Sequence, residues 1–158
     1  MNQQTQYSGL TMTNNLQNLL NKIKKSDHAT DSGSHMHSLM QHIVIDGKGT
    51  HGDNELVQQI LSHPNLDKFF TPASRTEVPI AGYINGKFVS RRIDRMVIDH
   101  DKKTIDILDY KTDIDKSAMV DTYIAQIGEY KTLVRDIYPQ YNVRGYILWT
   151  HDFSLQEI

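Results

Sequence analysis

The stretch that decides the fold of this chain runs from residue 93 to residue 112. It reads Ile93-Asp94-Arg95-Met96-Val97-Ile98, then a polar turn, then Ile105-Asp106-Ile107-Leu108-Asp109-Tyr110-Lys111-Thr112. The alternation on both flanks predicts a β-hairpin, closed at Asp99-His100-Asp101-Lys102 by a two- or four-residue loop. Side chains at i and i+2 share a strand face, so Asp109 and Lys111 should lie side by side. Asp94 is expected on the same face, diagonal to Asp109.

Two carboxylates and one ammonium on a sheet face are typical of a hard-cation site for phosphodiester hydrolysis. Mg²⁺ and Mn²⁺ prefer oxygen ligands and keep several waters for substrate and nucleophile. We expect Asp94 and Asp109 to be the principal ligands, and the backbone carbonyl of Tyr110 to supply a third oxygen. Lys111 would orient or deprotonate the attacking water, or stabilise the charged transition state. The sequence leaves these three roles open.

The composition sets broad limits on the class of protein. The chain has 158 residues, enough for one domain with a sizeable core. Its net charge of −2 argues against a generic polycationic coat for nucleic acid but allows a local basic groove. Without cysteine there is no disulfide framework, zinc ribbon or thiol nucleophile. The polar start and the lack of a long apolar run predict a cytoplasmic protein with no membrane partner.

Hydrophobic periodicity changes along the chain from helical to alternating and back. Asp46–Asp53 is expected to be a loop, and Asn85-Gly86 is a strong type I′ hairpin signal. The order predicts an α/β fold with a mixed β-sheet flanked by helices. The expected helices are Asn14–Lys25, His35–Ile45, Glu55–Ser62 and Ser117–Ile137, with a short turn over Asn65–Phe70; the expected strands are Glu77–Ile84, Lys87–Ile98, the Asp109 segment and Val143–Thr150.

The combined pattern resembles the PD-(D/E)XK nuclease superfamily, and more narrowly the nuclease domain of the RecB and AddA helicase–nucleases. The core of the resemblance is Ile-Asp-Arg, thirteen residues, then Asp-Tyr-Lys-Thr, followed by Gln126-x-x-x-Tyr130. Three further segments are similar to the family pattern, so the match covers residues from about 33 to 155. These segments are Gly33-x-x-x-His37 on an early helix, Glu77-Val78-Pro79-Ile80, and the passage from Tyr138-Pro139 to Trp149-Thr150.

The resemblance implies a restriction-endonuclease-like core over residues 33–158, preceded by an N-terminal polar segment and helix over residues 1–32. It implies a Mg²⁺- or Mn²⁺-dependent deoxyribonuclease, with exonuclease action as the expected mode and DNA as the partner. The metal ligands would be His37, Asp94 and Asp109, and Lys111 would be the catalytic lysine. Gln126 and Tyr130, one helical turn apart, would face the DNA or brace the site, and Glu77 is the least specific member.

The chain also departs from the family pattern. Ser32 stands where relatives often have arginine, and these 158 residues contain no helicase segment. The substrate would therefore come from a separate helicase or repair protein, or from DNA ends already exposed. An alternative function is a non-catalytic DNA-binding or protein-interaction module on a nuclease-like scaffold. A small Mg²⁺-dependent phosphatase needs the same acids but not this order of strands and helix.

Each candidate residue also has a structural interpretation. Asp94 could pair with a neighbouring arginine, Lys111 could be a solvated cation, and His37 could be a surface histidine. Gln126 and Tyr130 could be helix packing, and Glu77 a plain strand acid. The arginines at 91, 92 and 95 could grip phosphates or lie on a solvated strand face.

Overall fold

The computed structural model describes residues 33–48, 50–51 and 54–158. The chain divides into two compact units, Met1–His35 and Met36–Ile158. The expected helix Asn14–Lys25 lies outside the described residues. No helix in the described part of the chain is long and apolar enough to cross a membrane.

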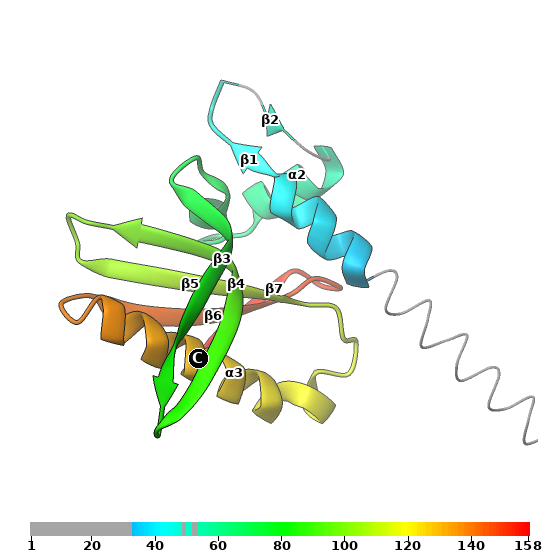
Figure 1. Cartoon of the computed structure of the whole chain (residues 1–158). Coiled ribbons are helices and arrows are strands. Elements are labelled where there is room, and N and C mark those ends of the chain that lie inside the picture. The colour runs from blue at the N-terminus through cyan, green and yellow to red at the C-terminus, as the bar shows by residue number, and fades with distance from the viewer. Residues whose placement is uncertain (1–32, 49, 52–53) are drawn as a thin grey trace, which may run out of the picture. The chain divides into compact units, whose positions relative to one another are not determined.

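A five-stranded mixed sheet organises the second unit, in the order β3-β4-β5-β6-β7 (Figure 1). Neighbouring strands are antiparallel except β5 and β6, which are parallel and are joined by helix α3. The coarse prediction of an α/β fold with a mixed sheet is thus confirmed. The bounds are β3 Ser74–Ile84, β4 Lys87–Asp99, β5 Thr104–Lys111, α3 Lys116–Ile137, β6 Asn142–Trp149 and β7 Ser154–Glu157.

Helices cover both faces of the sheet, so the unit has two apolar cores. Ile127, Leu133 and Val134 of α3 pack against one face, and Gly145 of β6 allows the close approach, because a Cβ there would collide with Ile127. The other face is covered by residues 36–42, which are helical, by α2 (Asn54–Ser62) and by the 3₁₀ helix η1 (Asp67–Phe70). The odd and even residues of β5 therefore lie in different environments.

The turns have the expected geometry, and helix α3 has a local cap. Asn85 and Gly86 have φ values of 51° and 76°, as the predicted type I′ turn between β3 and β4 requires. The β4–β5 hairpin pairs Asp99 with Thr104, so four residues form its loop. Helix α3 begins after Asp115, whose side chain accepts a hydrogen bond from the backbone N–H of Ser117.

One expected helix was too long, and three short strands were missed. The helix predicted to reach Ile45 is helical only to residue 42, because β-branched Val44–Ile45 forms strand β1. Its partner, β2 (Thr50–His51), lies within the segment expected to be a loop. Strand β7 was not predicted, since four residues carry too short a pattern to distinguish from a loop.

A break in the β3–β4 ladder lies beside the acids. Thr76 pairs with Arg95 and Val78 with Ile93, but the intervening Glu77 and Asp94 are unpaired. Glu77 has a φ of 52°, an unusual value for a residue other than glycine. Ile93 then packs in the α3 core while Arg95 enters the core on the other face, although residues two apart normally share a face. The hairpin therefore bends at this point.

Candidate active site

Three adjacent strands place three carboxylates in one row across the sheet. The register of β4 with β5 ends at Arg95 opposite Leu108, so the next position sets Asp94 opposite Asp109. On its other side, Asp94 lies across from Glu77 at the broken pair of the β3–β4 ladder. Asp94 was expected diagonal to Asp109, and the four-residue loop instead sets it directly across.

Asp109 is the more deeply buried of the two central acids and is only 3% exposed. Its Oδ2 lies 2.6 Å from the Lys111 Nζ but accepts no hydrogen bond of acceptable geometry among the described residues. Its Oδ1 is 3.5 Å from the Tyr130 hydroxyl, at the outer limit for a hydrogen bond. A buried carboxylate oxygen with lone pairs to spare is the kind of group that a cation or a bound water satisfies.

Asp94 is held between β5 and the helical residues 36–42. Its Oδ2 accepts a hydrogen bond from the Tyr110 backbone N–H at 2.8 Å and lies 3.6 Å from the His37 Nδ1. Burial, followed by the negative charge of Asp109, raises the pKa of Asp94 to about 7. The pair of acids therefore resists carrying two negative charges, and a cation between them would relieve that repulsion.

His37 completes the cluster from the opposite side of β5. Its Nε2 donates to the Tyr110 carbonyl oxygen at 3.1 Å, which brings together the ring and the backbone oxygen that were both expected to be metal ligands. The imidazole also packs edge-on against the Tyr110 ring, with centroids 5.3 Å apart. His42, further along the same helical segment, donates from Nδ1 to the Ser38 carbonyl oxygen at 2.6 Å instead.

Helix α3 braces Lys111 through Gln126 and Tyr130, the two helix residues that the family resemblance implied. Lys111 Nζ donates to the Gln126 Oε1 at 3.0 Å, and Gln126 Nε2 donates to the Tyr130 hydroxyl at 2.6 Å. The Tyr130 hydroxyl in turn donates to the Arg92 carbonyl at 3.2 Å. Because Gln126 and Tyr130 are one helical turn apart, a continuous chain of hydrogen bonds runs from Lys111 to the middle of β4.

Tyr123 is a site neighbour that the sequence reading missed. Its ring lies beneath the ammonium of Lys111, 4.2 Å from Nζ to the centroid, and its hydroxyl donates to Asp113 at 2.6 Å. The spacing contained the signal, because residues 123, 126 and 130 fall on one helix face. Lys111 is thus fixed by an acid, an amide and an aromatic ring.

The three arginines of β4 have different surroundings, and for Arg95 both sequence interpretations were wrong. Its side chain is 1% exposed and stacks on Phe70, so it neither grips phosphate nor lies on a solvated strand face. Arg91 pairs with Glu129 and Arg92 with Glu77, and both remain partly exposed. Glu77 therefore lies in the same row as Asp94 and Asp109, but its carboxylate is turned towards Arg92.

Arg95 connects the covering helices to the sheet. It donates to the carbonyls of Met40 and Ile43 at 2.7 Å each, at the end of the helical segment that carries His37. It also donates to Phe69 at the end of η1, and its Nε donates to the Tyr110 hydroxyl at 2.7 Å. The residue next to Asp94 therefore anchors the segment that carries His37, on the face of the sheet that this segment covers.

The donor set fits a hard divalent cation in its chemistry. It offers two carboxylates, a carbonyl oxygen and an imidazole, and one carboxylate oxygen lacks a hydrogen bond. Within residues 33–48, 50–51 and 54–158, no group of three or more His, Cys, Asp or Glu side chains is arranged to hold a metal ion. The side chains lie near one another but are turned to their protein partners, such as Lys111 for Asp109.

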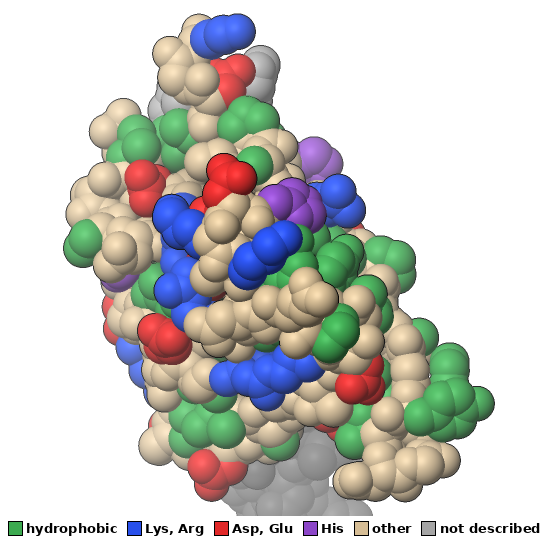
Figure 2. Space-filling view, turned by 90° about the vertical axis from the view of Figure 1, so that its left-hand side faces the viewer, with side chains coloured by type: hydrophobic (Ala, Val, Ile, Leu, Met, Phe, Trp, Pro, Cys, Tyr) green, Lys and Arg blue, Asp and Glu red, His purple; other side chains and the backbone are tan. Residues whose placement is uncertain are grey.

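Basic side chains gather at the far end of the same hairpin. Figure 2 views that end and shows Lys and Arg side chains across the middle of the face, with acidic side chains among them. The β4–β5 turn contributes exposed Lys102 and Lys103. Five residues of strand, roughly 17 Å, separate Thr104 from Asp109.

No protein-family model matches the chain, and no curated protein matches it at a significant level.

Proposed function

We propose that the chain is a metal-dependent deoxyribonuclease with a restriction-endonuclease-like core of the PD-(D/E)XK type that its sequence resembles. The observation that carries the proposal is the convergence of Asp94 and Asp109 from adjacent strands, with Lys111 Nζ 2.6 Å from one of them. An acid pair beside a lysine suits hydrolysis of a phosphodiester, where negative charge must be neutralised around an attacked phosphorus.

The proposed metal, Mg²⁺ or Mn²⁺, would be held by Asp94, Asp109, the Tyr110 carbonyl and His37. It would neutralise charge on the non-bridging phosphate oxygens and retain water for the attack. Asp94 must release its proton to act as a ligand, and its pKa of about 7 makes that step sensitive to pH near neutrality.

Lys111 would hold the attacking water or a phosphate oxygen. Its ammonium has three N–H donors, and Asp109 and Gln126 face only part of them. The ring of Tyr123 and the side chain of Gln126 fix its position, so little ordering is needed on substrate binding. Tyr130 and Gln126 would then be positioning residues for Lys111 rather than direct contacts to DNA.

DNA affinity should come mainly from phosphate contacts. The exposed cations of β4 and of the β4–β5 turn, among them Arg92 and Lys102, are candidates for these contacts. Binding should therefore weaken steeply with salt and show little base preference.

The test is cleavage of linear and circular, single- and double-stranded DNA with Mn²⁺, Mg²⁺ or EDTA. Wild type is compared with Asp109→Ala and with Asp101→Ala, which removes an exposed acid from the β4–β5 turn. Metal-dependent cleavage by wild type and Asp101→Ala, but not by Asp109→Ala, is expected, and sparing of circles would establish exonuclease action. Equal activity in wild type and Asp109→Ala would refute the proposal. Absence of both cleavage and a calorimetric Mn²⁺ site would favour the non-catalytic scaffold.

A further inference from the structure

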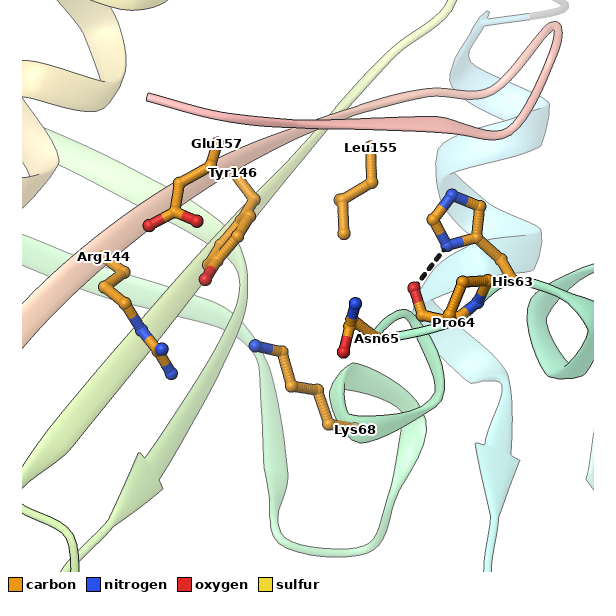
Figure 3. Close-up of a pocket in the computed structure, with 8 residues that line it drawn as sticks. All are labelled: His63, Pro64, Asn65, Lys68, Arg144, Tyr146, Leu155 and Glu157. Carbon is orange, nitrogen blue, oxygen red and sulfur yellow. Dashed lines mark hydrogen bonds between the residues drawn. The ribbon is translucent and has the colours of Figure 1, made fainter.

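A cavity of 370 Å³ opens on the face of the sheet opposite Asp109. Its walls come from the α2–η1 connection, from η1 and from strands β6 and β7, as the labelled residues of Figure 3 show. The volume lies at the lower end of the roughly 300–1,000 Å³ typical of small-molecule sites. Nothing in the proposed nuclease chemistry uses this cavity.

A buried carboxylate holds two cations together at one side of the cavity. Asp106 is 5% exposed and accepts from Lys68 Nζ at 2.8 Å, and from Nε and Nη2 of Arg144 at 2.6 and 2.8 Å. One negative charge therefore supports two positive charges, which leaves an excess of one positive charge in this group. Figure 3 shows the two cationic side chains pointing towards one another.

Both cations keep donors for a ligand. The side chains of Lys68 and Arg144 are 34% and 37% exposed. Asp106 occupies Nε and Nη2 of the guanidinium, and no described residue accepts from Nη1. The ammonium is also steadied by the Tyr146 ring, whose centroid is 4.8 Å away. A guanidinium beside an ammonium, both fixed in place, is a favourable arrangement for a phosphate group.

The remaining walls suit the body of a small organic molecule. Tyr146 contributes one ring, and Pro64 and Leu155 contribute apolar surface on the other sides. Asn65 sits between them and the cations, and its φ of 73° is one that asparagine tolerates better than most residues. Glu157 lies beside Tyr146 and would repel an anion there, so the phosphate belongs at the Lys68 end.

We propose that this cavity binds a phosphate monoester with a small aromatic body, of the size of a nucleoside monophosphate. The phosphate lies against Lys68, Arg144 and Asn65, and the aromatic body lies against Tyr146 and Leu155. The site is independent of the proposed nuclease centre, since Asp106 and Asp109 point to opposite faces of β5.

The experiment titrates the whole chain, in EDTA, with thymidine 5′-monophosphate, thymidine and inorganic phosphate, followed by calorimetry and by backbone NMR shifts. Asn65→Asp keeps the side-chain shape and the backbone preference but adds a negative charge at the phosphate position. Asn85→Asp is the matched control, because Asn85 also has a positive φ, 51°, but lies in the β3–β4 turn. Thermal unfolding of both variants verifies that they are folded.

We expect the monophosphate to bind with a Kd below about 1 mM, and thymidine and inorganic phosphate to bind at least about tenfold more weakly. Asn65→Asp should weaken binding about tenfold through repulsion of like charges, and Asn85→Asp should leave it unchanged. Absence of monophosphate binding at millimolar concentration would overturn the proposal. So would equal affinity for inorganic phosphate, unchanged affinity in a folded Asn65→Asp, or NMR shifts confined to residues 94–111.

Discussion

Two buried aspartates of strand β5, Asp106 and Asp109, lie three residues apart on opposite faces of the sheet and are treated differently by the fold. Asp106 accepts three hydrogen bonds from two cations, so both of its oxygens have partners. Asp109 has one oxygen at 3.5 Å from the Tyr130 hydroxyl and the other without an acceptable hydrogen bond. Their exposures, 5% and 3%, are nearly equal.

Burial alone does not distinguish a structural acid from a candidate ligand. The two acids differ in how many hydrogen bonds their carboxylate oxygens accept from the protein. Asp106 has opposite charges on both oxygens, an arrangement that stabilises a buried carboxylate. Asp109 has one cation, Lys111, beside it and a second acid, Asp94, close by, and its Oδ2 accepts no hydrogen bond of acceptable geometry. This arrangement costs stability unless a further cation binds.

We expect the largest difference between Asp109 and Asp106 in the rate of DNA cleavage. Asp109→Asn should lower metal-dependent DNA cleavage about a thousandfold or more, because it removes a ligand charge while keeping the shape. Asp106→Asn makes the same chemical change in the same strand and should leave the cleavage rate of the folded protein within about threefold. Cleavage rates are measured under conditions where circular dichroism shows both variants to be folded. Equal losses in the two variants would contradict the comparison.

The second-largest expected difference between the two acids is in the free energy of unfolding. Asp106→Asn should lower the free energy of unfolding by about 2–3 kcal/mol, since it weakens three hydrogen bonds to charged donors. Asp109→Asn should change it by less than about 1 kcal/mol in EDTA, because losing the ion pair with Lys111 is offset by relief of the repulsion between Asp109 and Asp94. Urea denaturation of both variants at pH 7 gives the two values, and a larger loss in Asp109→Asn would reverse the assignment.

A third prediction uses Asp94, whose pKa is raised to about 7. Between its unfolded pKa near 3.8 and this value, the folded chain keeps a proton that the unfolded chain has released. This group therefore lowers the stability of the wild type as pH rises from about 4 to about 7. In EDTA, Asp94→Asn should exceed the wild type in stability by about 1–2 kcal/mol at pH 8, with the difference shrinking towards pH 4. A constant difference across this range would show that Asp94 is ionised throughout.

The smallest effect concerns the hydroxyl that lies 3.5 Å from Asp109. Tyr130→Phe should lower cleavage about threefold to tenfold by loosening Gln126 and, through it, Lys111. The pH dependence of cleavage should change with it, since Lys111 loses part of its positioning. Tyr141→Phe is the matched control, because its hydroxyl contacts His100 near the β4–β5 turn. Identical cleavage rates and pH dependence for wild type and Tyr130→Phe would show that the hydroxyl of Tyr130 has no role in cleavage and that the residue only packs.

Much of the fold was predictable because its signals are local. Asn85 and Gly86 specify their turn through backbone preference, and Asp115 caps α3 through its own side chain. The alternation in β5 predicted that Asp109 and Lys111 share a face, and their 2.6 Å contact agrees.

The errors came where tertiary contacts decide. The break at Glu77 places Arg95 in the core that contains Phe70, whereas alternation from Ile93 alone would place it on the face that packs against α3. The partners of Asp106 lie 38 residues away in both directions along the chain, so no local pattern marks it as paired. Sequence periodicity predicts which residues belong to the same helix or strand. It does not predict which distant side chains neutralise a buried charge.

The hydrogen bonds donated by the buried Arg95 also have a consequence for how the chain folds. Its acceptors at Met40 and Phe69 are 55 and 26 residues away in sequence, and its guanidinium is buried only when both segments are docked. Docking one segment without the other would leave a buried cation short of acceptors, a costly intermediate. Helix and sheet should consequently assemble in a single cooperative step, so that His37 and Asp94 meet only in the finished fold.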